Sequence, residues 1–212
     1  MGDDDRQDLP YGEDFHDPAV AAEWADAAAR KRPWRPQLFD RFAREALVAD
    51  AAAPRILELG SGPGFLAEAV LDRCPSVGRY TLLDFSDPML ALSRQRLAGH
   101  RGRTAFVRAD FKSEAWPILA GGPFDLAFSL QAVHELRHKR HAPRLYARLR
   151  PLLAPTGRLL VCDHLPEVAP TARERRLYMT IPEYLAVLSD AGFRHPEVVW
   201  TDHHMALYRA RV

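Results

Sequence analysis

The chain has 212 residues, of which 47% are hydrophobic and 27% charged, a composition typical of one globular domain. Its formal net charge of +1 lacks the positive excess that marks proteins binding nucleic acid or anionic membranes, so we expect neither as a partner. The acidic start MGDDDRQDLP does not resemble a signal peptide, and no apolar run reaches the roughly 20 residues that span a bilayer.

The first part of the chain predicts helices that follow a polar tail. Residues 1–17 are predicted to be loose, and the alanine-rich stretch 18–32 predicts a helix with Pro18 in its first turn. Prolines in KRPWRP interrupt this helix before a second, amphipathic one over residues 36–50. We assign residues 1–35 to a tail and helical cap, and residues 36–212 to the main domain.

Further along, short apolar segments alternate with helical ones. Strands are predicted at 55–59, 80–85, 104–110, 124–130 and 157–164, and helices at 63–74, 87–99, 138–153 and 181–192. Asp87 is the expected N-cap of its helix, and the two final segments, 194–201 and 204–212, follow too closely for a crossover and predict an antiparallel pair. Apolar strands spaced by helices indicate an α/β fold with a mostly parallel sheet covered on both faces.

The two cysteines, Cys74 and Cys162, fall in a predicted helix end and a predicted strand, without CxxC spacing. We interpret both as reduced core residues, which favours a cytoplasmic location.

The stretch ILELGSGPGFLAEAV places Gly60, Gly62 and Gly64 between the first strand of this alternation and the helix after it. Glycines there permit a sharp turn and close approach of a ligand to the backbone, although a purely structural turn is the alternative. The spacing is GxGxG and not the dinucleotide pattern GxGxxG, whose third glycine is replaced by Phe65. The loop therefore predicts a nucleotide-like cofactor other than a dinucleotide.

Two aspartates end the next predicted strands. Asp84 in LLDFSDPM can accept hydrogen bonds from adjacent ribose hydroxyls, although capping of the following helix is the alternative. Asp110 in RADF can reach an adenine amino group by the same logic. Both positions predict an adenosine-containing ligand at the carboxyl ends of the strands.

Four motifs in order, ELGSGPG, LLDFSDPML, RADF and FDLAFSLQAVHEL, resemble the class I S-adenosylmethionine-dependent methyltransferases over about residues 54–212. The resemblance implies a Rossmann-like, doubly wound, seven-stranded sheet whose last strand is antiparallel. It also implies S-adenosylmethionine as cofactor and S-adenosylhomocysteine as product. The cofactor-binding residues that it implies are Glu58, Gly60, Ser61, Gly62, Gly64, Asp84, Phe85, Met89, Asp110, Phe111, Leu130 and Gln131.

The sequence HELRH over residues 134–138 matches the HExxH motif of zinc proteases, and His141 adds a third imidazole. Our prediction places His134 just beyond a strand and not within a helix, so the ligands need not converge. The methyltransferase resemblance already accounts for a histidine at this strand end. We therefore expect no metal site.

Candidate catalytic residues lie at the ends of two predicted strands. His134 is the first candidate for a base that deprotonates the acceptor, with packing or a loop-holding role as the alternative. Asp163 and His164 end the strand GRLLVCDH, and because neighbouring strand residues face opposite sides, we expect only one of them to line the site.

The acceptor is expected to be a small molecule, with O- or N-methylation favoured. Four aromatic residues of the flanking segments are candidates for a wall over it, although each could simply pack on the core: Trp24, Trp34, Phe39 and Tyr178. A non-enzymatic S-adenosylmethionine-binding protein and, less favoured, a nicotinamide-dependent oxidoreductase are the alternatives. The sequence does not indicate the oligomeric state.

Overall fold

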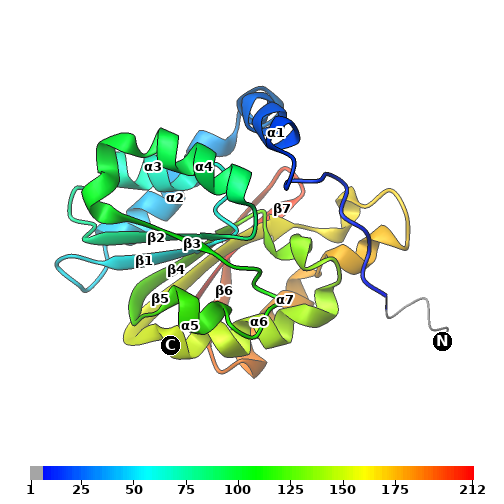
Figure 1. Ribbon diagram of the computed structural model, residues 1–212. Coiled ribbons are helices and arrows are strands. Elements are labelled where there is room, and N and C mark those ends of the chain that lie inside the picture. Colours follow the sequence, from blue (N-terminus) through cyan, green and yellow to red (C-terminus); the bar gives the residue numbers. More distant parts are fainter. Residues whose placement is uncertain (1–6) are drawn as a thin grey trace.

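A seven-stranded sheet forms the centre of the molecule, with helices on both faces (Figure 1). The computed structural model describes residues 7–212. Along the sheet the strand order is β3-β2-β1-β4-β5-β7-β6, and β7 runs in the opposite direction to the other six strands. This confirms the predicted α/β, Rossmann-like sheet with its antiparallel last strand. The strands are β1 (Arg55–Leu59), β2 (Arg79–Asp84), β3 (Thr104–Arg108), β4 (Phe124–Leu130), β5 (Leu153–His164), β6 (Arg194–Asp202) and β7 (Met205–Arg211).

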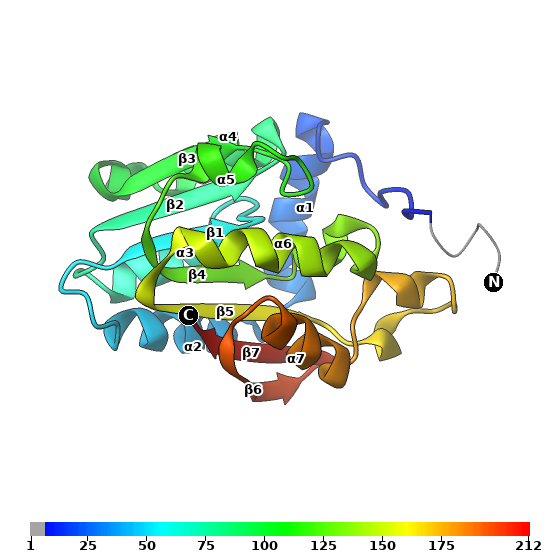
Figure 2. The same cartoon turned by 90° about the horizontal axis from the view of Figure 1, so that it is seen from below.

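Two apolar cores, one on each face, hold the helices against the sheet. The helices are α1 (Pro18–Lys31), α2 (Arg35–Leu47), α3 (Phe65–Arg73), α4 (Asp87–Arg96), α5 (Trp116–Ala120), α6 (Ala142–Leu149) and α7 (Ile181–Asp190). Successive strand residues point to opposite faces, so Ile56 packs with α2 and α3 while Leu57 and Leu59 pack with α6 and α7. Figure 2 shows α6 and α7 over the second face. Cys74 and Cys162 are buried free cysteines, as predicted.

Local capping chemistry determines where several helices begin. The hydroxyl of Ser86 accepts a hydrogen bond from the amide of Met89 and caps α4, so the predicted cap at Asp87 is wrong by one residue. Thr180 and Glu183 form a reciprocal capping box at the start of α7. The short helix α5 was not predicted; its proline-containing sequence WPILA is anchored by the fully buried Trp116.

Residues 7–17 are ordered by specific contacts, although the sequence predicted a loose tail. Leu9 is 7% exposed, and its amide donates to the carbonyl of Arg137 at 2.9 Å. Asp8 pairs with Arg140 and His141 at 2.8 and 2.7 Å. A polar segment without periodicity gives no sign of such anchors, because all of its partners lie far along the chain. Residues 1–6 of the predicted tail lie outside the described residues, and the domain division remains a prediction.

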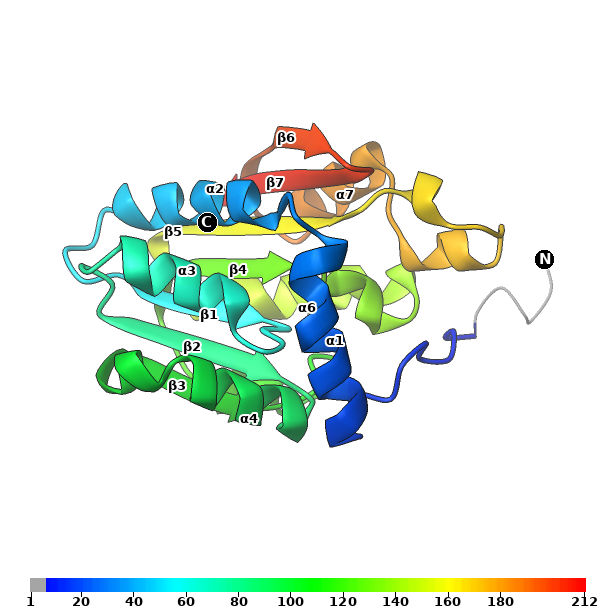
Figure 3. The ribbon, with the colours of Figure 1, turned by 90° about the horizontal axis from the view of Figure 1, so that it is seen from above.

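The segment 7–17 and α1 cross the same end of the sheet, where β1, β2 and β4 finish (Figure 3). The carboxyl ends of parallel strands are the usual place for ligands in such sheets. Within residues 7–212, no helix is both long and apolar enough to span a membrane.

Candidate functional site

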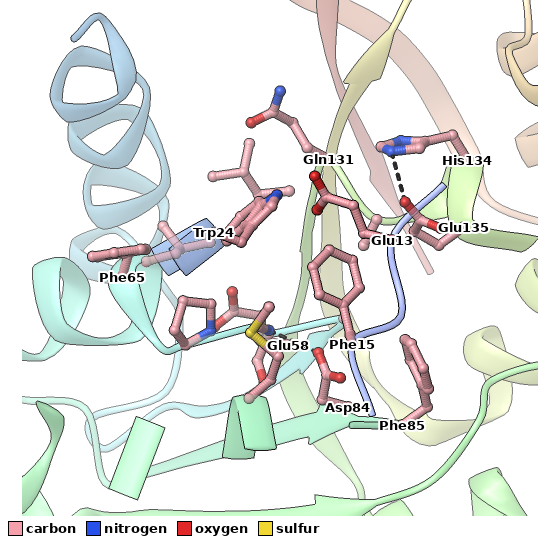
Figure 4. Close-up of a pocket in the computed structure, with 18 of the residues that line it drawn as sticks. Glu13, Phe15, Trp24, Glu58, Phe65, Asp84, Phe85, Gln131, His134 and Glu135 are labelled. Carbon is pink, nitrogen blue, oxygen red and sulfur yellow. Dashed lines mark hydrogen bonds and ion pairs between the residues drawn. The ribbon is translucent and has the colours of Figure 1, made fainter. Parts of the chain in front are cut away.

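A cavity of about 460 Å³ lies at the carboxyl ends of the strands. Its walls come from the glycine loop after β1, the ends of β2, β4 and β5, α1, the start of α2 and the segment 7–17 (Figure 4). All of the predicted cofactor-binding residues except Gly64 and Asp110 line it. The volume lies within the range of about 300–1,000 Å³ that small-molecule sites occupy.

The glycine loop turns tightly beside the cavity. Gly60 has φ +66°, and a Cβ there would lie 2.3 Å from the Cβ of Ala132, so no larger residue fits without displacing the backbone. The amides of Gly60 and Ser61 both donate to the carbonyl of Leu83 at 2.8 and 3.1 Å. These bonds hold the loop against the end of β2.

Asp84 lies at this junction with its carboxylate facing the loop. Its Oδ2 accepts from the amide of Gly62 at 2.8 Å and its Oδ1 from the amide of Ser86 at 2.9 Å. Burial raises the pKa of Asp84 to about 6, and these hydrogen bonds, which lower the pKa, offset only part of that effect. The carboxylate is therefore ionised at neutral pH and retains further lone pairs toward the cavity it lines.

Glu58 is the second acidic residue of the floor. It is 2% exposed, and its Oε2 accepts a hydrogen bond from the hydroxyl of Tyr80 at 2.8 Å. Burial raises the pKa of Glu58 to about 8, so the free protein carries it mostly protonated at neutral pH. A positively charged ligand group beside it would favour the ionised form.

Two predicted cofactor-binding residues do not reach the cavity. Gly64 is the N-cap of α3 and packs against Ser93 of α4. Asp110 is exposed, because a tight turn after β3 directs its carboxylate back to the amide of Lys112 at 2.7 Å. Phe111 lines the cavity from that turn instead.

The ring of His134 is held between two carboxylates. Its Nδ1 lies 2.7 Å from Oδ1 of Asp163 and its Nε2 lies 3.3 Å from Oε1 of Glu135, the latter contact drawn in Figure 4. Burial lowers the pKa of His134, but Asp163 and Glu135 together raise it to about 10. Both ring nitrogens are therefore donors at neutral pH, and His134 has no free lone pair with which to act as the predicted base.

His164 is uncharged at neutral pH, in contrast to His134. Arg35 donates to Oε1 of Gln131 through Nε and Nη2 at 3.0 and 2.6 Å, which fixes the orientation of the amide. The amide nitrogen of Gln131 then donates to Nε2 of His164 at 2.9 Å. Burial lowers the pKa of His164 to about 4, so its ring is neutral. As expected from strand alternation, His164 lines the cavity and Asp163 does not.

Aromatic and charged side chains close the outer part of the cavity. Three of the four aromatic candidates, Trp24, Phe39 and Tyr178, line it, whereas Trp34 stacks on His203 with ring centroids 5.1 Å apart. Four further residues that line it were not predicted from the sequence: Glu13, Phe15, Arg35 and Arg137. Glu135 also lines it, and the sequence singled it out only as part of the HELRH motif.

The segment 7–17 covers the cavity mouth. The guanidinium of Arg137 donates to the carbonyls of Leu9 and Pro10. The ring of Tyr11 stacks on Phe85 with centroids 5.9 Å apart, and the carbonyl of Phe15 accepts from the hydroxyl of Ser86 at 2.6 Å. These contacts place the cover directly over the residues expected to hold an adenosine.

The HELRH motif does not assemble a zinc site. Nδ1 of His138 accepts from the amide of Arg140 at 3.0 Å, and both ring nitrogens of His134 face carboxylates. Across residues 7–212 no group of three or more His, Cys, Asp or Glu side chains is arranged to hold a metal ion.

Comparison with known proteins places these features in a family. A family model described as a methyltransferase domain matches residues 56–157. A trans-aconitate 2-methyltransferase of Variovorax paradoxus is 30% identical over 187 residues, covering 76% of this chain and 69% of that protein. A demethylmenaquinone methyltransferase of Clavibacter sepedonicus is 32% identical over 140 residues, covering 66% and 53%.

Solved structures show the same fold. An O-methyltransferase family protein from Burkholderia thailandensis superposes with a TM-score of 0.76 at 19% identity, covering 100% of this chain and 66% of that one. The chain spans about half the length of several curated relatives that it matches.

Proposed function

The chain belongs to the class I S-adenosylmethionine-dependent methyltransferases, and on that premise we propose that it transfers a methyl group to a small-molecule acceptor. The observation that carries the proposal is the junction of Asp84 with the glycine loop. There an ionised carboxylate and a glycine backbone without side chains border one cavity. The carboxylate suits a ribose diol, and the glycine backbone leaves room for the neighbouring sulfur, which is a sulfonium cation in S-adenosylmethionine and a neutral thioether in S-adenosylhomocysteine.

The residues of the cavity fit each part of S-adenosylmethionine. Asp84 would accept hydrogen bonds from the two ribose hydroxyls, and Phe85, Met89 and Phe111 offer apolar surface to the adenine. Glu58 lies where its carboxylate can neutralise the ammonium group of the methionine portion. Its raised pKa would then fall on binding, because a nearby cation favours the charged form.

When bound, the cofactor supplies an electrophilic methyl group on a sulfonium, and the protein must bring a nucleophile in line with it. Leu130 and Gln131, at the end of β4, line the cavity between the glycine loop and the pair His134 and His164. Gln131 is held by Arg35 and is therefore a rigid wall for the acceptor. Trp24, Phe39 and Tyr178 exclude water from the outer part.

We propose for His134 a positioning and electrostatic role in place of the base role predicted from the sequence. Asp163 would orient the imidazole ring, and His164 would contact the acceptor. Relatives are named for trans-aconitate and for demethylmenaquinone, so their names do not agree on an acceptor. We favour O- or N-methylation of a small molecule, and the cytoplasm as its location.

The test is isothermal titration of S-adenosylhomocysteine into the purified protein. We expect micromolar binding that Asp84→Ala abolishes. Asp87→Ala is the matched control, since its side chain is three residues away, exposed, and paired with Arg108 at the surface. Absence of binding to the wild-type protein, or equal binding by both variants, would remove the basis of the proposal. Binding without methyl transfer to any acceptor would favour the non-enzymatic alternative.

A further inference from the structure

Two arginines face the cavity without forming an ion pair with any described carboxylate. The guanidinium carbons of Arg32 and Arg35 lie 5.1 and 5.5 Å from the ring centre of Trp24, and both side chains line the cavity. Arg35 is 8% exposed and bonds only to the neutral amide of Gln131, and within residues 7–212 neither arginine has an ion pair. Burial lowers the pKa of both guanidinium groups, which stay charged at neutral pH.

The buried charge of Arg35, with the half-buried charge of Arg32 beside it, is costly unless an anion accompanies it. The methionine portion of the cofactor brings one carboxylate, which can neutralise one guanidinium. The second guanidinium then remains available to another anion. Two carboxyl groups of the cavity interact with this pair without forming an ion pair: Glu13, an exposed residue of the covering segment, with Arg32, and the mostly protonated Glu58 with Arg35.

Among the described residues, no imidazole or tyrosine oxygen on the acceptor side of the cavity is free to accept a proton. Both nitrogens of His134 donate to carboxylates. Nε2 of His164 accepts from Gln131, so the proton of this neutral ring lies on Nδ1, which has no partner among the described residues. Glu135 is bonded to Arg137 at 3.2 Å as well as to His134. Burial raises the pKa of the Tyr178 hydroxyl, which is therefore neutral. This site offers positive charge and hydrogen-bond donors, which do not suit the deprotonation of a phenol or an ammonium group.

We propose that the acceptor is a carboxylic acid, which this protein methylates to a methyl ester. The inference rests on the proposed methyl transfer and specifies its substrate class. A carboxyl group is already ionised at neutral pH, so its oxygen attacks without a base. The new bond joins carboxylate oxygen to the methyl carbon, the bond from sulfur to that carbon breaks, and its electron pair stays on sulfur. No proton is transferred, and the products are the ester and S-adenosylhomocysteine.

The first experiment supplies methyl-labelled S-adenosylmethionine with a panel of di-, tri- and aromatic carboxylic acids at millimolar concentration, and with phenols and amines in parallel. We expect label in a carboxylic acid product that mild alkali releases as methanol. At saturating S-adenosylmethionine, where ionisation of Asp84 and Glu58 no longer limits cofactor binding, we also expect a kcat that does not rise with pH between 6 and 9. Alkali-stable label, a rate that increases about tenfold per pH unit, or label in none of the acids would overturn the inference.

Variants then test the charges. Of Arg32→Gln and Arg35→Gln, one is expected to weaken S-adenosylhomocysteine binding. The other is expected to raise the KM of the acid at least about tenfold, as for loss of one charge-assisted hydrogen bond. Glu13→Gln is expected to lower that KM, since it removes a competing carboxylate. Arg30→Gln, an exposed position of α1 outside the cavity, is the control.

The proposed function and the inference fail in different ways. If the acceptor is not a carboxylic acid, the wild-type protein still binds S-adenosylhomocysteine. In that case no acid is esterified, or neither arginine variant raises the KM. If the protein is not a methyltransferase that uses S-adenosylmethionine, the wild-type protein does not bind S-adenosylhomocysteine in the first titration.

Discussion

The imidazole of His134 should contribute stability as a buried cation, and Asp163→Asn tests this. The asparagine preserves the shape of the side chain and one acceptor, but it removes the charge that faces Nδ1 at 2.7 Å. In the folded protein the pKa of His134 is about 10, whereas an unperturbed imidazole has a pKa of about 6.5. Through proton linkage this difference corresponds to roughly 4 kcal/mol at pH 7 for Asp163 and Glu135 together. Asp163 contributes the larger part, so its loss should cost close to the roughly 3–5 kcal/mol that breaking a buried pair costs.

For a chain of this length the loss should lower the Tm by about 10 °C at pH 7. The pH dependence of this stabilisation follows from the raised pKa of His134. The contribution is fully present below the unfolded pKa of about 6.5, and it disappears as the pH rises through about 10, the folded value. The gap in Tm between wild-type protein and variant should therefore shrink steadily from pH 7 to pH 10.

Thermal unfolding followed by circular dichroism at several pH values measures this gap. The matched control is Asp202→Asn. The side chains of Asp202 and His203 are both exposed and lie 3.7 Å apart, so this substitution should leave the Tm nearly unchanged. A gap that stays constant to pH 10 would contradict the imidazolium assignment. An NMR resonance of the His134 ring that titrates near pH 6.5 in the wild-type protein would contradict it equally.

Three further outcomes follow from the cofactor side of the cavity. Gly60→Ala should cost about 1–3 kcal/mol of stability and weaken S-adenosylhomocysteine binding, because its Cβ would overlap Ala132, whereas Gly99→Ala, with open space around it, should do neither. Ser86→Ala should lower the Tm by about 2–4 °C through loss of the α4 cap, measured by thermal unfolding. Binding of S-adenosylhomocysteine should weaken as the pH falls through about 6, where protonation of Asp84 removes hydrogen-bond acceptors; titration calorimetry between pH 5 and 8 measures this.

The sheet and its helices were predictable from the sequence because their signals are local. Strand β1 and the glycines after it are recognisable from an apolar run, a tight turn and a helix start, and the same holds for β2 with Asp84. Most of the predicted cofactor-binding residues line the cavity for this reason, since the carboxyl ends of parallel strands meet at one edge. Their roles remain predictions until binding is measured.

The rest of the site depends on contacts between distant segments. Arg137 has φ +65° and anchors Leu9, more than a hundred positions earlier, and no pattern within residues 7–17 indicates this partner. Arg35 looks like the first residue of an ordinary helix until α2 is placed beside Gln131. The direction of the Asp110 carboxylate could not be predicted either. It depends on the tight turn after β3, in which the carboxylate accepts from the amide of Lys112 and does not face the cavity.

Charge state is the property that the sequence concealed most completely, and it changes the chemistry expected of the site. In the motif HELRH the glutamate suggests a base and the histidine a metal ligand or proton acceptor. In the fold, β5 brings Asp163 to the other side of His134, so Glu135 and Asp163 together stabilise an imidazolium. His164, one residue beyond Asp163, is kept neutral by burial among nearby cations. A site with a fixed cation, a neutral ring and two unpaired arginines is better suited to holding an acceptor that is already ionised than to creating one.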